Sequence, residues 1–100
     1  MSINFNFEWD PKKAHSNMQK HGVRFEEAAT VFIDPMALTI YDAEHSESEQ
    51  RWITMGISKN SRLLIICHTF NYVSQKSVTI RIFFSRKANR HETHWYEGQL

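Results

Sequence analysis

The sequence predicts one α+β domain over residues 1–100, with a mostly antiparallel sheet, an N-terminal helical hairpin and a C-terminal helix. Apolar residues alternate with polar ones in several short segments, a spacing that is typical of strands. Other segments, near both ends, carry apolar residues at helical spacing. Only 3 Gly and 2 Pro occur in the 100 residues, which argues against a disordered or linker-rich chain.

The chain begins with a predicted strand that is followed by two helices. Residues 3–7 alternate between apolar and polar, as in a half-buried strand. Asp10 and Pro11 then begin a helix, because Asp can cap its free amides and Pro suits its first position. This helix ends at Gly22, which can adopt a left-handed cap. A second helix covers residues 25–33, and we expect the two helices to form a hairpin.

From Ala37 onward the apolar period changes to two, and four strands are expected. The third of them is continuously apolar, so we expect it to be central and covered on both faces. Polar residues fill the loops and turns, including 43–50 and 71–76. The four strands expected here are 38–42, 53–57, 63–67 and 78–85. After them, the last helix is expected from Arg86 to Glu97.

The charges are divided unevenly along the chain. Residues 1–50 carry four Lys or Arg and nine Asp or Glu, whereas residues 51–100 carry eight and two. This division suggests a basic surface for a polyanion in the second half. Mixed charges that only keep a small domain soluble are the alternative.

Several protein classes are excluded by composition. No apolar run approaches the roughly 18 residues of a membrane helix, and the first nine residues lack a signal-peptide pattern. Cys67 is the only cysteine, so no internal disulfide can form, and we expect a cytoplasmic protein without membrane association. The six His and Cys67 show no metal-ligand spacing, so we expect neither a metal nor another cofactor.

Arg81 is the most informative candidate for chemistry because it lies in the middle of a strand that is otherwise apolar. A guanidinium there must reach an acid, a carbonyl or an anionic ligand. A structural salt bridge and a phosphate-binding role both remain open. Other cations, aromatics and histidines could join it in binding or proton transfer: Arg62, Arg86, Lys87, Arg90, Tyr72, Tyr96, His45 and His68.

A series of motifs runs through nearly the whole chain in order: Phe7-Glu8-Trp9-Asp10-Pro11-Lys12-Lys13-Ala14, Lys20-His21-Gly22-Val23, Phe25-Glu26-Glu27-Ala28, His45-Ser46, Arg62-Leu63-Leu64, His68-Thr69, Ile80-Arg81-Ile82, Arg86-Lys87-Ala88 and Tyr96-Glu97. In these motifs the chain resembles the BrnT family, the toxins of a group of type II toxin–antitoxin systems. The chain departs from that family's pattern at several positions: Arg24 replaces a capping Ser or Thr, and Phe70 and Asn71 stand where a basic residue is frequent. Ser61 stands where a turn glycine is usual, and Phe84 replaces a small residue.

The resemblance implies a RelE-like fold and a metal-independent endoribonuclease that cleaves RNA and inhibits translation. It also implies a cognate BrnA-type antitoxin, promoter DNA bound only through that antitoxin, and room for a homodimer within the complex. The implied catalytic residues are Arg62, Arg81 and Arg86, with His45 and His68. The implied RNA-binding residues are Arg51, Lys87, Arg90 and Tyr96.

The expected reaction is attack of an RNA 2′-hydroxyl on the adjacent phosphorus. Arg81 and Arg86 would stabilise charge on the phosphoryl oxygens. Arginine stays protonated and is a poor base, so His45 or His68 is preferred for proton transfer. The alternative function is a catalytically weak or inactive module that binds nucleic acid or an antitoxin.

Overall fold

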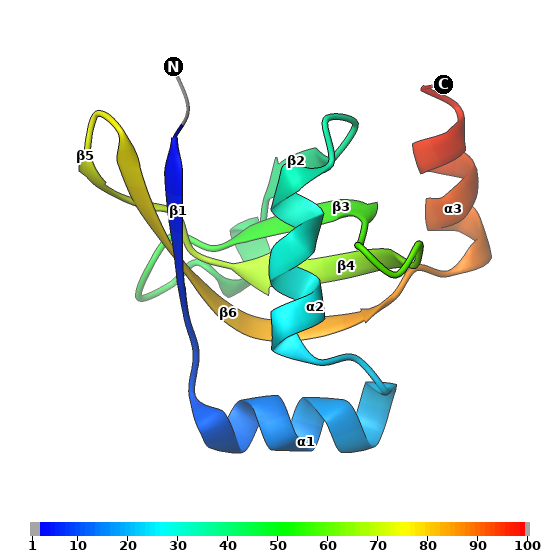
Figure 1. The fold of residues 1–100 in the computed structure, drawn as a ribbon, viewed down its shortest axis with the longest axis horizontal. Helices are drawn as coiled ribbons and strands as arrows, with labels where there is room; N and C mark the ends of the chain where they lie inside the picture. The colour runs from blue at the N-terminus through cyan, green and yellow to red at the C-terminus, as the bar shows by residue number, and fades with distance from the viewer. Residues whose placement is uncertain (1–2, 100) are drawn as a thin grey trace.

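The computed structural model describes residues 3–99, in which a six-stranded sheet carries helices on both faces (Figure 1). The strand order is β1-β6-β4-β3-β2, and β5 also pairs with β6. In chain order the elements are β1 (Asn4–Glu8), α1 (Pro11–His21), α2 (Phe25–Ala29), the 3-10 helix η1 (Thr30–Ile33), β2 (Leu38–Tyr41), the 3-10 helix η2 (Ala43–His45), β3 (Trp52–Ile57), β4 (Leu63–His68), β5 (Asn71–Ser74), β6 (Ser77–Lys87) and α3 (Arg90–Glu97).

The sheet is mostly antiparallel, as the sequence predicts, and β1 alone of the described strands pairs in parallel, with β6. The predicted central strand is confirmed, because β4 lies between β3 and β6. The predicted helix caps are confirmed too. Asp10 accepts a hydrogen bond from the amide of Lys12, and Gly22 takes a left-handed conformation with φ 67°.

Three details of the prediction need correction. The segment 71–76 is not only a turn, because Asn71–Ser74 forms β5 against β6. The last helix begins at Arg90 rather than Arg86, since β6 continues to Lys87 and Asn89 then caps α3. The helical hairpin is not confirmed: β1 precedes the helices, as expected, but α1 and α2 run in different directions and not antiparallel to each other (Figure 1).

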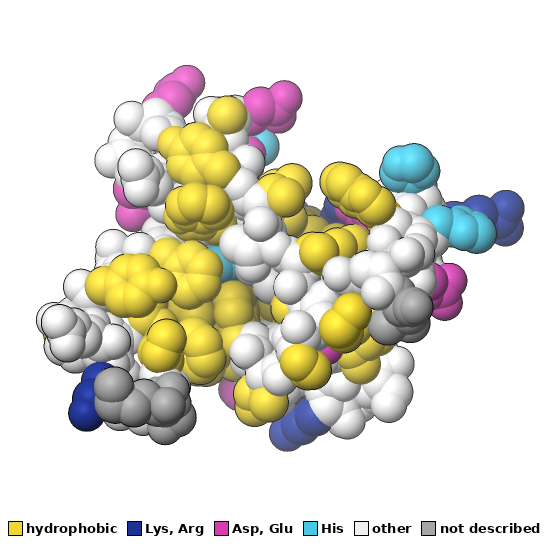
Figure 2. Space-filling view, turned by 90° about the horizontal axis from the view of Figure 1, so that it is seen from above, with side chains coloured by type: hydrophobic (Ala, Val, Ile, Leu, Met, Phe, Trp, Pro, Cys, Tyr) yellow, Lys and Arg dark blue, Asp and Glu magenta, His cyan; other side chains and the backbone are white. Residues whose placement is uncertain are grey.

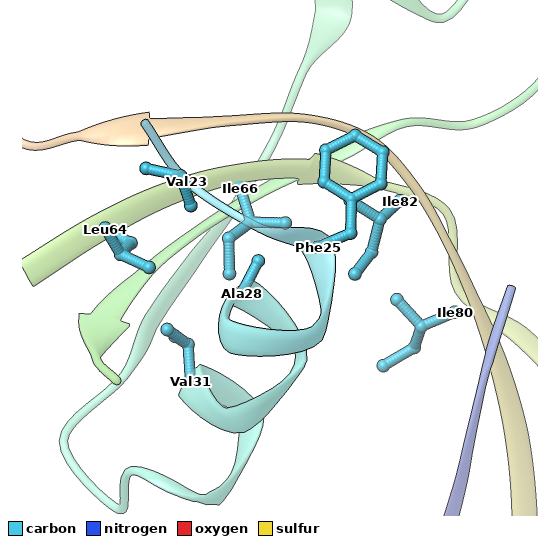
Figure 3. Close-up of a cluster of buried hydrophobic side chains, with 8 residues drawn as sticks. All are labelled: Val23, Phe25, Ala28, Val31, Leu64, Ile66, Ile80 and Ile82. Carbon is cyan, nitrogen blue, oxygen red and sulfur yellow. The ribbon is translucent and has the colours of Figure 1, made fainter. Parts of the chain in front are cut away.

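The larger core lies between the sheet and the α2 layer (Figure 3). Phe25, Ala28 and Val31 follow the helical spacing of one apolar face, and each is fully buried. They pack against alternate residues of β4 and β6, which are Leu64, Ile66, Ile80 and Ile82. Each large side chain buried in this way contributes roughly 1.5–3 kcal/mol. This layer fixes the sheet that carries the candidate site.

A second, smaller core lies on the opposite face of the sheet. Met55 and Ile65 pack there against Tyr96 of α3. α3 covers only part of this face, and an open groove of about 300 Å³ remains between Ile40, Phe84 and Trp95.

A β-bulge changes the orientation of side chains along β6. His68 pairs with Ile82 and Cys67 pairs with Phe84, so Phe83 is an extra residue in the strand. Ile82 therefore faces the α2 layer, whereas Phe84 faces the α3 side. Arg81, before the bulge, and Arg86, after it, come to the same face of the sheet.

Candidate functional site

Phe83 is surrounded by three cationic side chains from separate parts of the chain, namely α1, the loop before β3, and β6 itself. The guanidinium carbon of Arg51 lies 4.1 Å from the ring centroid, and that of Arg81 lies 6.0 Å from it. The ammonium nitrogen of Lys13, on α1, lies 5.2 Å from the same centroid. These separations are in the cation–π range. We call Lys13, Arg51, Arg81 and Phe83 the Phe83 cluster.

The backbone of Arg81 is fixed by hydrogen bonds, whereas its side chain makes a long, exposed ion pair. Its amide donates to the hydroxyl of Thr69, and the amide of Thr69 donates to its carbonyl. The guanidinium lies 3.7 Å from a carboxylate oxygen of Glu8. The Arg81 side chain is 41% exposed and that of Glu8 is 52% exposed. A pair this exposed contributes little stability, so the guanidinium is available to an anion.

Arg51 follows a loop that also presents a histidine to solvent. The hydroxyl of Ser46 accepts from the amide of Arg51 and donates to the carbonyl of Asp42, which closes the loop. The Nε of Arg51 is buried without a hydrogen-bond partner among the described residues. An Nη of Arg51 lies 3.6 Å from Glu49, a long ion pair. The guanidinium is therefore incompletely paired.

His45 and Asp42 form an oriented pair in this loop. The ring Nδ1 of His45 lies 2.9 Å from the carboxylate of the buried Asp42, and the His45 side chain is 63% exposed. Because an ionised carboxylate only accepts hydrogen bonds, we assign the proton to Nδ1. Nε2 then carries the free lone pair that a proton acceptor needs.

Arg86 lies on the same sheet face, but its guanidinium already forms an ion pair with Glu92. Two of its nitrogens donate to both oxygens of Glu92 at 2.8 and 2.9 Å. The hydrogen bond from Arg86 lowers the pKa of Glu92, against the effect of burial. Burial and the charge of Asp42 raise the pKa of the nearby Cys67 thiol, whereas Arg86 and Arg51 oppose that rise. Of the two arginines, Arg86 is the better paired one.

Arg62 lies apart from this face, and its side chain connects two parts of the fold. Its guanidinium donates to both carboxylate oxygens of Glu27 and to the carbonyl of Gly22. The hydrogen bond from Arg62 holds the pKa of the buried Glu27 at about 2, although burial raises it. The contact joins α2 to the turn between β3 and β4.

His68 and Tyr96 are core residues. His68 is fully buried, with Nε2 2.6 Å from the hydroxyl of Thr54 and Nδ1 2.9 Å from the carbonyl of Thr69. Burial lowers the pKa of His68 to about 4, so the ring is neutral at pH 7. The Tyr96 hydroxyl donates to Asp34, and burial together with this contact raises its pKa to about 12. Neither group faces solvent, so our site does not include them.

Lys87 and Arg90 are exposed at the end of β6 and the start of α3. Lys87 pairs in register with Leu64, whereas the bulge lies at the other end of β4, beside His68. These two cations are therefore separated from the Phe83 cluster by the length of β4.

The described residues show no site that would hold a metal through protein ligands. No three His, Cys, Asp or Glu side chains come together between residues 3 and 99.

In the same part of the chain, no helix is long and apolar enough to cross a membrane. Figure 2 shows a face on which hydrophobic side chains gather, with acidic, basic and histidine side chains around its edge.

A family model described as "Ribonuclease toxin, BrnT, of type II toxin-antitoxin system" matches residues 9–92. The chain belongs to the BrnT family. The structure is also similar to a crystal structure of the ribonuclease toxin BrnT from Brucella abortus, with a TM-score of 0.57 and 17% sequence identity. That alignment covers 87% of this chain and 100% of the other, and it supports the fold. A comparison with curated proteins gave no match.

Membership of the BrnT family makes the protein a type II toxin of the ribonuclease class, with an antitoxin as partner and RNA as substrate. The site geometry adds three residues that sequence reasoning missed. Phe83 shares a strand face with Arg81, and Asp42 lies three residues before His45, so both carried a usable spacing signal. Lys13 had none, because its contact with β6 is purely tertiary.

Proposed function

We propose that this BrnT-family toxin is a metal-independent endoribonuclease that inhibits translation by cutting RNA at the Phe83 cluster. The observation that carries the proposal is the pair of guanidinium groups of Arg51 and Arg81 around one ring. Both are poorly paired within the protein. Fork-shaped donors of this kind match the oxygens of a phosphodiester.

The loop of His45 supplies the proton acceptor. Nε2 of His45 removes the proton from the RNA 2′-hydroxyl, and the 2′-oxygen attacks the adjacent phosphorus. The bond from phosphorus to the 5′-oxygen breaks, and that oxygen takes a proton from water. Asp42 holds the ring and stabilises the imidazolium that forms. The products carry a 2′,3′-cyclic phosphate and a free 5′-hydroxyl.

Arg51 and Arg81 supply the positive charge that this reaction requires. Negative charge grows on the nonbridging oxygens as the 2′-oxygen attacks, and guanidinium donors fixed beforehand stabilise it. Because arginine keeps its proton at every physiological pH, this charge does not depend on a bound cation. Metal independence of the reaction follows from this assignment.

A cognate antitoxin of the BrnA type is the proposed inhibitor. It would act by covering the Phe83 cluster, and the complex would bind promoter DNA through the antitoxin. We place the toxin in the cytoplasm, where it meets RNA. The homodimer within the complex and the RelE-like classification of the fold stay predictions.

Purified toxin incubated with RNA in excess EDTA tests the chemistry. We expect cleavage to continue in EDTA and the products to end in a 2′,3′-cyclic phosphate. Loss of cleavage in EDTA with recovery in Mg²⁺ or Zn²⁺ would overturn the metal-independent reaction. Intact RNA with a well-folded wild-type protein would favour the binding-module alternative.

Substitution of the cluster tests the site. Arg51→Ala and His45→Ala are each expected to reduce the cleavage rate by roughly a hundredfold. Arg24→Ala is the matched control, because Arg24 is exposed at the start of α2 and its side chain makes no cap hydrogen bond. Equal rates for Arg51→Ala and Arg24→Ala would exclude the Phe83 cluster as the cleavage site.

A further inference from the structure

α1 presents a stripe of cations along β6. Lys13, Asn17 and Lys20 are spaced by four and three residues, so they share one face of the helix. The helix has no acidic residue in its first turn or elsewhere in its sequence. None of the ion pairs found among residues 3–99 uses a lysine. The lysine charges on this helix are therefore not neutralised by close acidic partners.

Asn17 fixes this stripe against the sheet. Its amide nitrogen donates to the carbonyls of Ser85 and Val23 at 2.8 and 3.0 Å, and its amide oxygen accepts from the backbone of Ser85 at 3.0 Å. Asn17 is 5% exposed, so these hydrogen bonds are shielded from water. The anchor places Lys13 and Lys20 about one helical turn to either side of it.

An open groove of about 360 Å³ lies between α1 and β6. Its polar wall comes from α1 and its apolar floor comes from Phe83 and Phe84. His21 also lines the groove, and the centroid of its ring lies 4.9 Å from that of Phe84. We call this space the α1 groove. The helix side of the groove is formed by Lys12, Lys13, Ser16, Asn17, Lys20 and His21.

The α1 groove adjoins the Phe83 cluster through shared residues. Phe83 lines the groove and also contacts Arg51 and Arg81. Lys13 likewise lines the groove and lies over the same ring. A strand of RNA that places a phosphate between the two arginines therefore has a basic channel for its next nucleotide. Lysines beside aromatic rings are the usual combination for single-stranded nucleic acid.

We propose that the α1 groove binds one nucleotide of single-stranded RNA next to the cleaved bond. Lys13 and Lys20 contact its phosphates, and its base packs on the aromatic floor. This inference rests on the proposed ribonuclease function for the identity of the ligand. It also assigns RNA contacts to the acidic half of the sequence, where the charge count alone places none.

Binding of a fully 2′-O-methylated RNA oligonucleotide tests the groove, because this probe lacks the attacking hydroxyl and stays intact. For the Lys13→Ala/Lys20→Ala double variant we expect at least a tenfold loss of affinity. We also expect the slope of log affinity against log salt to fall by about 1.4, from roughly 0.7 for each single-strand phosphate contact. Ala is a strong helix former, so α1 is retained, and circular dichroism checks this.

Lys59→Ala/Lys76→Ala is the matched control. Both residues are exposed in turns outside the groove, and the pair removes the same charge. We expect less than a twofold change for the control. Equal losses for the two double variants would overturn the α1 groove as a site.

Cleavage of unmodified RNA separates the two proposals. Wild-type toxin that binds the probe but cleaves nothing, with binding still dependent on Lys13 and Lys20, supports the groove and overturns the ribonuclease mechanism. Wild-type toxin that cleaves RNA, while the Lys13→Ala/Lys20→Ala variant binds the probe as the wild type does, overturns the groove alone.

Discussion

Arg81 owes its position to the strand and not to an ion pair. Its backbone is held by Thr69, and Glu8 is an exposed partner. We therefore expect Arg81→Ala to lower the free energy of unfolding by less than about 1 kcal/mol. Cleavage should fall roughly a hundredfold to a thousandfold, because a donor to the developing charge is lost. Thermal melting and single-turnover cleavage measure the two effects.

Glu8→Gln is the control for Arg81→Ala, since it removes the partner charge and keeps the arginine. Its cleavage rate should match that of the wild type. A variant of Arg81 that melts far lower, yet still cleaves RNA while folded, would show that the guanidinium is structural.

Ser61 carries backbone strain that a glycine would relieve. Its φ is 60°, a left-handed conformation that costs an L-residue about 1 kcal/mol, at the position where the family resemblance expects glycine. Ser61→Gly should stabilise the protein by about that amount, which corresponds to a rise in Tm of roughly 4–8 °C. Differential scanning calorimetry measures the change.

Gly22→Ala is the reciprocal case. Gly22 has φ 67°, and an added Cβ would meet nothing within 4 Å, so the cost is conformational alone. Its Tm should fall by a similar amount. A lower Tm for Ser61→Gly would mean that the serine side chain stabilises the turn.

The contact between Glu27 and Arg62 joins two elements, and its loss should destabilise both. Arg62→Ala leaves the buried carboxylate of Glu27 without its charged partner. We expect a loss of roughly 3 kcal/mol, the lower end of the range for buried pairs, because Arg62 itself is partly exposed. Urea unfolding at pH 7 measures it. An unchanged unfolding midpoint with no cleavage would instead restore Arg62 as a catalytic residue.

The same contact predicts an acid-sensitive stability. The folded-state pKa of Glu27 is about 2, below the ordinary value of 4.5. The carboxylate therefore contributes its full stabilisation above pH 4.5, and this part is lost as the pH falls toward 2. Glu27→Gln should show a weaker decline of stability across that interval. Parallel declines for the two proteins would locate the acid sensitivity elsewhere.

The sequence predicted correctly the elements that depend only on residues close to one another in the chain. The Asp10 cap, the Gly22 cap and the apolar strand β4 belong to this group. β5 was missed because its residues are mostly polar or exposed, and only pairing with β6 makes them a strand. The bulge at Phe83 carries no glycine to mark it.

The candidate site was predictable where side-chain direction follows from alternation. Alternation along the strand places Arg81 opposite Val78, Ile80 and Ile82, and the structure has these three residues buried and Arg81 on the other face. Whether a polar residue is buried depends instead on partners far along the chain. Arg62 meets Glu27 across 35 positions, and His68 meets Thr54 across 14. No local pattern distinguishes such residues from exposed catalytic ones.

At the scale of the whole molecule, Asp34 connects three layers. Its carboxylate accepts from the amides of Met36 and Ile57 and from the hydroxyl of Tyr96 on α3. Burial raises the pKa of Asp34, but the three hydrogen bonds together lower it by more, so the net shift is downward. Asp34→Ala should cost roughly 3 kcal/mol, about 1 kcal/mol for each lost hydrogen bond.

Tyr96→Phe separates one of these contacts from the rest. It should cost about 1 kcal/mol, since the ring and its packing remain. Urea unfolding of both variants gives the comparison. Equal losses would mean that the attachment of α3 accounts for the whole role of Asp34.

Phe83, the extra residue of β6, belongs to the proposed site but pairs with no residue of β4. Ile82 and Phe84 already face opposite sides, as direct neighbours in a regular strand would. Deleting Phe83 would therefore join two halves that are already in phase, and every pairing with β4 would survive. We therefore expect the remaining ten of the eleven residues of β6 to keep the sheet. The eleventh, Phe83, has Lys13, Arg51 and Arg81 around its ring, so its deletion should remove the proposed site while the sheet remains.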